Sequence, residues 1–146
     1  MTTLTIQQIK EVSEQLDCGF KCFWNRKTNE LLFVPDTDKY PDVEDEEFAE
    51  ELEKLDTNFE DYVEIESMPS RESYDIMVEF MEQVSDAKLK NQLANALNRN
   101  KPFREFKDVL DESGEQRTEW FSFKNEKLNE WVVKQFDYLS RTNEEQ

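Results

Sequence analysis

The chain has 146 residues, a common size for one folded domain, and its 18 Lys and Arg against 35 Asp and Glu give a net charge of −17. It has no histidine and two glycines, which excludes Ser-His-Asp and Cys-His nucleophile systems, His-ligated zinc sites and glycine-rich phosphate motifs. The longest apolar run, Leu31 to Val34, is far below the about 20 residues that span a bilayer, and no signal pattern precedes Lys10. We therefore expect a soluble, acidic, cytoplasmic protein without a membrane segment.

The N-terminal half predicts a helix, a β-hairpin, a second helix and a third strand. Thr5 and Gln8 fit a capping box that starts the first helix, and Gly19 ends its periodic pattern. Aromatic and branched residues on both sides of the polar turn 27–29 predict the hairpin, and alternation over 62–65 predicts the third strand. The second helix begins near residue 45, and we expect it to bury Phe48, Leu52, Leu55 and Phe59.

The C-terminal half predicts helices throughout. Ser70 is suited to cap one helix, another follows from residue 86, and Pro102 is well placed as the first residue of a third, which Gly114 ends. A last helical stretch covers 115–139, with a break expected near Lys124. The expected core includes Phe103, Phe106, Trp120 and Trp131. The predicted fold is a single α+β domain over residues 1–140, followed by a frayed acidic tail over 141–146.

The two cysteines are spaced C-x3-C. In an extended strand the Cα atoms of Cys18 and Cys22 lie roughly 13 Å apart, beyond the about 7 Å that a disulfide allows, although a turn at Gly19 shortens this distance. We expect two reduced thiols packed as small apolar groups. No further soft ligands are offered for a metal, and Lys21 alone is weak support for a reactive thiol.

Four segments occur in an order that resembles a known family of bacterial proteins, the uncharacterised protein family (UPF) 0158. They are "NRKTNELLFVPD", "IESMPSRESYDIMVEFMEQV", "LANALNRNKPFREFKDVL" and "EWFSFKNEKLNEWVVKQF", of which "PSRESYDIM" and "PFREFKD" are the most specific. The resemblance covers about residues 4–137. It implies a small, soluble bacterial protein and supplies organisation rather than an activity. The family pattern has glycines just before the "FREFKD" segment, where this chain has residues 99–102, "RNKP".

Negative charge is concentrated between Asp42 and Glu66, where thirteen acidic residues and one lysine, Lys54, leave −12 of the total. A solvated helix face explains such a run, whereas a binding surface for basic proteins or cations, or a mimic of nucleic acid, is the functional alternative. One stretch also offers oxygen ligands at five positions of an EF-hand-like loop, namely Asp36, Asp38, Asp42, Glu44 and Glu47. Tyr40 and Pro41 stand where that loop needs a ligand and a glycine, so we predict no metal site.

The counterpart of the acidic run is "NRNKPFREFKD", where Arg99, Lys101, Arg104 and Lys107 alternate with two phenylalanines. Basic residues beside aromatic rings are typical of single-strand binding surfaces. The same pattern also arises when phenylalanines anchor a core and the cations pair with acidic neighbours. With a net charge of −17 we expect the second explanation and predict that nucleic acid is not the partner.

No carboxylate stands in an apolar setting that would mark it as a general acid or base. We therefore expect a non-enzymatic domain without catalytic residues or cofactors, acting through contact with an unidentified, basic protein partner, and regulation is one role such contact could serve. The candidate contact residues are Glu47, Glu50, Glu51, Arg104 and Lys107. The alternative from another class is a carboxylate-based, metal-dependent hydrolase. The sequence leaves the oligomeric state open.

Overall fold

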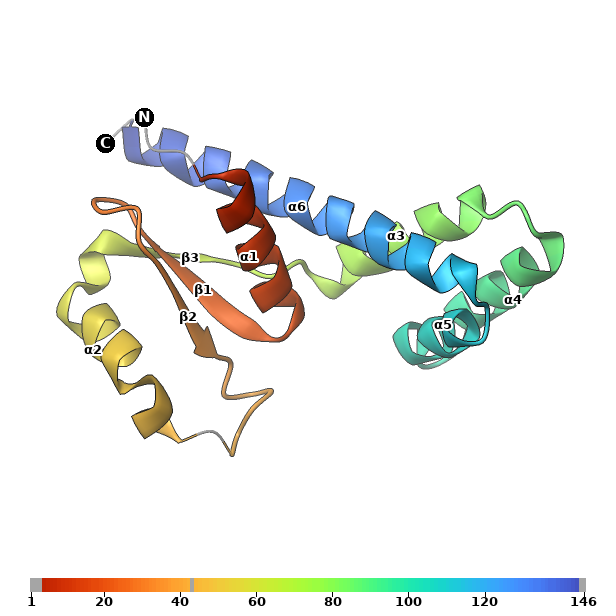
Figure 1. Cartoon of the computed structure of the whole chain (residues 1–146), viewed down its shortest axis with the longest axis horizontal. Helices are drawn as coiled ribbons and strands as arrows, with labels where there is room; N and C mark the ends of the chain where they lie inside the picture. The colour runs from red at the N-terminus through yellow and green to blue at the C-terminus, as the bar shows by residue number, and fades with distance from the viewer. Residues whose placement is uncertain (1–3, 43, 145–146) are drawn as a thin grey trace. The chain divides into compact units, whose positions relative to one another are not determined.

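A computed structural model describes residues 4–42 and 44–144, and it confirms the α+β fold class (Figure 1). The chain divides into two compact units: the first contains the residues up to Ser67 and from Asn129 onward, and the second contains Met68–Leu128. Elements of the first unit are α1 (Ile6–Asp17), β1 (Phe20–Asn25), β2 (Leu31–Pro35), η1 (Asp45–Phe48), α2 (Ala49–Thr57), η2 (Phe59–Asp61) and β3 (Tyr62–Ile65). The second unit contains α3 (Ser70–Gln83), α4 (Ala87–Leu97) and α5 (Pro102–Asp111), and α6 (Glu115–Glu144) contributes residues to both units.

The first unit is built on a three-stranded antiparallel sheet in the order β2-β1-β3. Cys22, in the central strand β1, lies opposite Phe33 of β2 and Ile65 of β3. Because side chains alternate across a strand, Cys22, Trp24 and Ile65 share one face of the sheet. That face forms a core with Leu4, with Val12 and Leu16 of α1 and with Val132 and Phe136 of α6.

The opposite face of the sheet also buries apolar side chains. Leu32 and Val34 of β2 alternate with the residues of the core face and are each 6% exposed. Helix α2 contacts β2 here and lies on the other side of the sheet from α1 (Figure 1). No residue of α2 itself is buried, so this helix contacts the sheet only through partly exposed side chains.

Local hydrogen bonds explain why the predicted start of α1 and the hairpin turn form where they do. The backbone N–H of Gln8 donates to Thr5 Oγ1 (3.1 Å), and that of Thr5 donates to Gln8 Oε1 (2.9 Å), which completes the capping box. In the turn, Asn25 Oδ1 accepts the backbone N–H groups of Lys27 and Thr28. The adjacent Trp24 donates its indole N–H to Asn29 Oδ1 (2.7 Å), and Asn29 has φ = 66°.

Gly19 joins α1 to β1 in a conformation that other residues rarely adopt, with φ = +91°. A Cβ atom at this position would lie 2.8 Å from Lys39 Cδ and 3.3 Å from a ring carbon of Tyr40. The loop that carries these two residues is held close by Tyr40, whose hydroxyl donates to the Cys18 carbonyl. Gly19 is therefore needed both for the turn and for the close approach of this loop.

The second unit is helical and has its own apolar core. Helices α3, α4, α5 and the start of α6 bury nine residues together: Met77, Phe80, Val84, Leu89, Leu93, Leu97, Phe106, Leu110 and Trp120. Trp120 makes edge-to-face contacts with Phe80 (5.3 Å between ring centroids) and with Phe106 (5.1 Å). Each of the two units thus buries a separate cluster. That the chain folds as one domain over residues 1–140 stays a prediction.

Three details differ from the expected elements. Pro69 rather than Ser70 is the N-cap of α3, and no side chain caps that helix end. Helix α6 continues over Glu115–Glu144 without the break expected near Lys124. It also continues through Glu144, within the predicted frayed tail, and the last two residues lie outside the described part of the chain. Among the described helices, none is both long and apolar enough to cross a membrane.

Candidate functional site

The candidate contact residues of the acidic run lie on and beside α2. Glu47 and Glu50 are exposed, as the helical spacing predicts, whereas Glu51 is half-buried. Exposed carboxylates continue around the same segment from η1 to η2, and we call this set the acidic surface: Glu46, Glu47, Glu50, Glu53, Asp56 and Glu60. Acidic residues in the first turn of α2 also interact favourably with the positive end of the helix dipole.

The apolar side of this segment is only partly covered, contrary to the sequence expectation. Phe48 is half-buried and packs edge-to-face on Phe20, with 6.0 Å between ring centroids, and Leu55 is half-buried. Leu52, however, is 38% exposed and Phe59 is 69% exposed. The helix ends at Thr57 and the chain turns at Asn58, so Phe59 no longer follows the helical register that the sequence pattern assumed. Two exposed apolar side chains therefore lie among the carboxylates.

Helical spacing places Lys54 on the solvent side of α2, but the side chain is half-buried and connects the helix to the sheet. Its ammonium lies 3.4 Å from Glu30 Oε1, and the Tyr62 hydroxyl donates to the same oxygen (3.1 Å). The hydrogen bond to Glu30 raises the pKa of Lys54, and partial burial followed by the Glu30 contact raises the pKa of Tyr62. The pattern analysis missed this cluster because its three members come from different elements.

The predicted basic residues lie in the second unit, at the start of α5. Arg104 and Lys107 are both exposed. Phe103 is 45% exposed and Phe106 is 1% exposed, so the expectation that both rings anchor the core is wrong for Phe103. Phe106 and Leu110 occupy the inward side of the helix, and Phe103, in the first turn of the same apolar stripe, is not part of the buried cluster. We call Lys101, Phe103, Arg104 and Lys107 the basic surface.

Arg99, which precedes the basic surface in sequence, forms an ion pair within the chain. Arg99 lies 3.3 Å from Glu105 Oε2, and these two residues line an open depression of about 430 Å³ together with Asn100 and Lys101. Among the described residues, the ion pairs do not include Lys101, Arg104 or Lys107. The expectation that the basic cluster is an internal partner for acidic neighbours therefore holds for Arg99.

Charge is distributed unequally between the two units. Residues 68–128 contain ten Lys and Arg and twelve Asp and Glu, a net charge of −2, so the rest of the chain carries −15. The acidic and the basic surface therefore belong to different units. An uneven distribution of charge creates local potentials, so we expect a negative potential at the acidic surface and a positive one at the basic surface.

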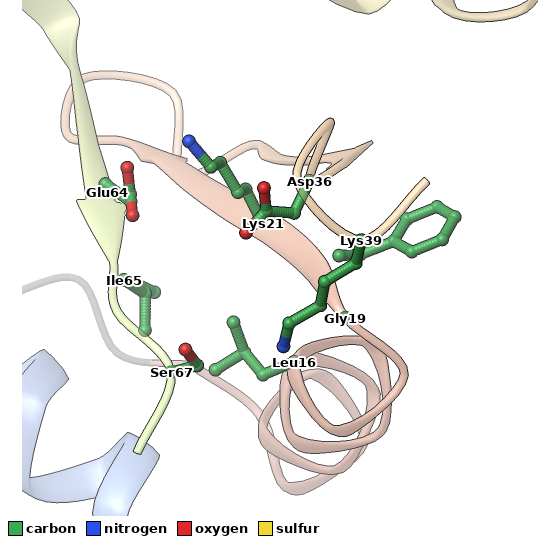
Figure 2. Close-up of a pocket in the computed structure, with 9 residues that line it drawn as sticks. Leu16, Gly19, Lys21, Asp36, Lys39, Glu64, Ile65 and Ser67 are labelled. Atoms are coloured by element: carbon green, nitrogen blue, oxygen red, sulfur yellow. The ribbon is translucent and has the colours of Figure 1, made fainter. Parts of the chain in front are cut away.

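A small hollow of about 50 Å³ lies beside Gly19 in the first unit (Figure 2). Its polar lining combines Lys21 and Lys39 with Asp36 and Glu64, and Figure 2 shows Lys39 extending past Gly19 toward Leu16. Small-molecule sites are usually about 300–1,000 Å³. A volume of this size suits a water molecule or two, and the mixed charges select neither cations nor anions.

The cysteines are free thiols, one exposed and one buried. Burial, followed by the charges of Glu11 and Glu64, raises the pKa of Cys22 to about 12, so its thiol is protonated at neutral pH. Cys18 is exposed at the end of α1. Cys22 is packed as an apolar group as predicted, whereas the same prediction is wrong for Cys18, which is exposed.

At the first of the five EF-hand-like positions, Asp36 makes hydrogen bonds with the backbone of its own loop and of Gly19. Asp36 Oδ1 accepts the backbone N–H of Asp38 (2.9 Å), and the backbone N–H of Asp36 donates to the Gly19 carbonyl (3.2 Å). Within residues 4–42 and 44–144, no three His, Cys, Asp or Glu side chains come together as a metal-binding group. The acidic surface is thus a set of separate carboxylates.

Comparison with known proteins supports the family resemblance. The model of the Uncharacterised protein family (UPF0158) matches residues 1–144. UPF0158 protein PA5073 from Pseudomonas aeruginosa is 35% identical over 69 residues, which are 47% of this chain and 45% of that relative, so the match spans less than half of the relative's length. No solved structure matches the chain. Since the family model covers nearly every residue, the chain belongs to the family UPF0158.

Proposed function

We propose that the chain is a non-enzymatic interaction domain that binds a basic protein through its acidic surface, and that it does so in the cytoplasm, where such contact regulates the partner. The observation that carries the proposal is the exposure of Phe59 and Leu52 among six carboxylates. Exposed charges alone serve solubility. Apolar side chains left uncovered within a charged surface are typical of a protein-binding site, because their burial supplies affinity while the charges supply specificity and a fast association.

The attachment of α2 to the sheet also supports a role in binding. The helix buries no residue of its own, and its Lys54 forms a partly exposed ion pair with Glu30. Charge reversal on its outer side should therefore leave the fold intact, since exposed pairs contribute about 0–1 kcal/mol to stability. Binding can thus be tested separately from folding.

The test compares protein capture from a bacterial lysate by three purified forms of the full chain. These are the wild type, a variant with Glu47→Lys, Glu50→Lys and Glu51→Lys, and a control with Asp75→Lys, Glu82→Lys and Glu119→Lys. Both variants change the net charge equally, but the control residues are exposed in the second unit. We expect the wild type and the control to retain the same basic proteins and the first variant to lose them.

The captured protein is then purified and its association rate is measured against salt concentration. The acidic-surface variant should associate more slowly, with a weaker dependence on salt. Unchanged capture by that variant would contradict the proposed binding surface. Turnover of an ester, phosphoester or nucleotide, abolished when one carboxylate is changed to its amide, would contradict the non-enzymatic part of the proposal.

A further inference from the structure

We propose that the basic surface of one copy of the chain docks on the acidic surface of a second copy. This inference rests on the proposed function, because it names one basic partner for the acidic surface. It also assigns a role to Arg104 and Lys107, which the proposed function leaves unused. The argument depends on the two surfaces having complementary charge and complementary exposed apolar groups.

The basic surface has cations that are available for such a contact. Lys101, Arg104 and Lys107 are exposed, and the ion pairs among the described residues do not use them. Phe103, 45% exposed, lies between them in sequence and one helical turn before Lys107. Aromatic and arginine side chains are enriched at protein interfaces.

The acidic surface offers the matching groups. Its six exposed carboxylates share the segment from η1 to η2 with two exposed apolar side chains, Leu52 and Phe59. Docking would cover Phe103 with these side chains and place its flanking cations near the carboxylates. The other cation of the segment, Arg99, is already paired with Glu105 and would remain so.

The net charge of −17 makes two copies repel each other at long range. At physiological salt the Debye length is about 8 Å, so the charges at the point of contact decide the interaction once the surfaces are close. Because the two surfaces differ, the contact is head-to-tail and leaves one surface of each kind free on a pair. Association should therefore be weak, increase with protein concentration and continue beyond dimers.

Sedimentation velocity of the full chain over a range of concentrations tests this inference. We expect the wild type to associate at concentrations approaching about 1 mM, the upper limit for a weak specific contact. Two variants should each weaken self-association at least about tenfold: Arg104→Glu with Lys107→Glu, and Glu47→Lys with Glu50→Lys and Glu51→Lys. The control with Asp75→Lys, Glu82→Lys and Glu119→Lys should associate like the wild type or more strongly, since its net charge is lower.

Mixing the two deficient variants gives the decisive result. The Arg104→Glu, Lys107→Glu variant keeps the acidic surface, and the other variant keeps the basic surface. An equimolar mixture should therefore associate through the one intact surface that each variant keeps, although neither variant associates alone. A mixture that stays monomeric contradicts the inference, because one intact surface of each kind is present.

Two other results would also overturn it. The wild type could remain monomeric at every concentration, or Arg104 and Lys107 could instead bind a single-stranded oligonucleotide while the chain stays monomeric. In either case the capture experiment with the acidic-surface variant still tests the proposed function independently. Loss of captured basic proteins together with a monomeric wild type would retain the proposed function and exclude self-association.

Discussion

The two thiols of the chain, only four residues apart, lie in opposite environments. Cys18 is exposed, while Cys22 is buried in the central strand with its pKa raised to about 12. At pH 8 we expect iodoacetamide to label Cys18 quickly and Cys22 only through unfolding, since the thiolate is the reactive species. Mass spectrometry should show one label per folded chain and two in guanidinium chloride. In a Cys18→Ser variant the fast label should disappear.

The same burial predicts a pH dependence of stability. The folded state keeps Cys22 protonated to about pH 12, whereas the thiol of the unfolded chain has an ordinary pKa of 9.0. Between these values the unfolded state binds fewer protons, so the contribution of this residue to stability decreases as pH rises from 9.0 toward 12. If the labelling experiment gave equal rates for the two cysteines, Cys22 would not be buried and this dependence of stability on pH would be absent.

At the scale of single elements, α5 separates two phenylalanines that the sequence pattern treats alike. Phe106 is 1% exposed and contacts Trp120, while Phe103 is 45% exposed. We expect Phe106→Ala to lower the free energy of unfolding by about 3–5 kcal/mol, because it leaves a cavity in the helical core. Phe103→Ala should cost about 1 kcal/mol or less. Urea titrations of both variants measure the difference, and equal losses would contradict the structure.

Elements whose signals are local could be predicted from the sequence. The capping box at Thr5 and the strand Tyr62–Ile65 depend on neighbouring residues, and both form as expected. The burial of side chains could not be predicted as well, because it depends on what covers each element. Periodicity marks an apolar side of α2, but only its partial contact with the sheet leaves Leu52 and Phe59 exposed.

The candidate site shows the same limit. Sequence reasoning identified Glu47, Glu50, Glu51, Arg104 and Lys107 as exposed charges, and all are exposed except Glu51, which is half-buried. It missed the ion pair of Lys54 with Glu30, which are 24 residues apart, since no local pattern connects them. It also missed Phe59 as a surface residue, although Asn58, a residue with low helix propensity, was a signal that the helix ends early.

For the whole molecule, the uneven charge predicts how salt affects stability. The residues outside 68–128 carry −15, and six of their carboxylates are exposed on the acidic surface. Repulsion among them should be stronger in the folded state than in the expanded chain. We therefore expect the melting temperature at pH 8 to rise between about 20 mM and about 300 mM NaCl, as the Debye length shortens. Differential scanning calorimetry measures this change.

The acidic-surface variant provides the matched comparison. With Glu47, Glu50 and Glu51 changed to Lys, the local repulsion decreases, so the rise in melting temperature with salt should be smaller than in the wild type. A melting temperature that falls with salt would mean that attractive pairs, such as Lys54 with Glu30, outweigh the repulsion. The calorimetric trace also shows whether the two units unfold in one transition or two.

The division of the chain into units has a consequence for its synthesis. The second unit is contiguous in sequence, so its core can form as soon as residues 68–128 have left the ribosome. The first unit is discontinuous, because Val132 and Phe136 complete the core begun by Val12 and Trp24. These contacts join residues more than a hundred positions apart and form late. Until translation passes Phe136, α1 alone covers this face of the nascent sheet, which makes this interval the one in which a chaperone is most needed.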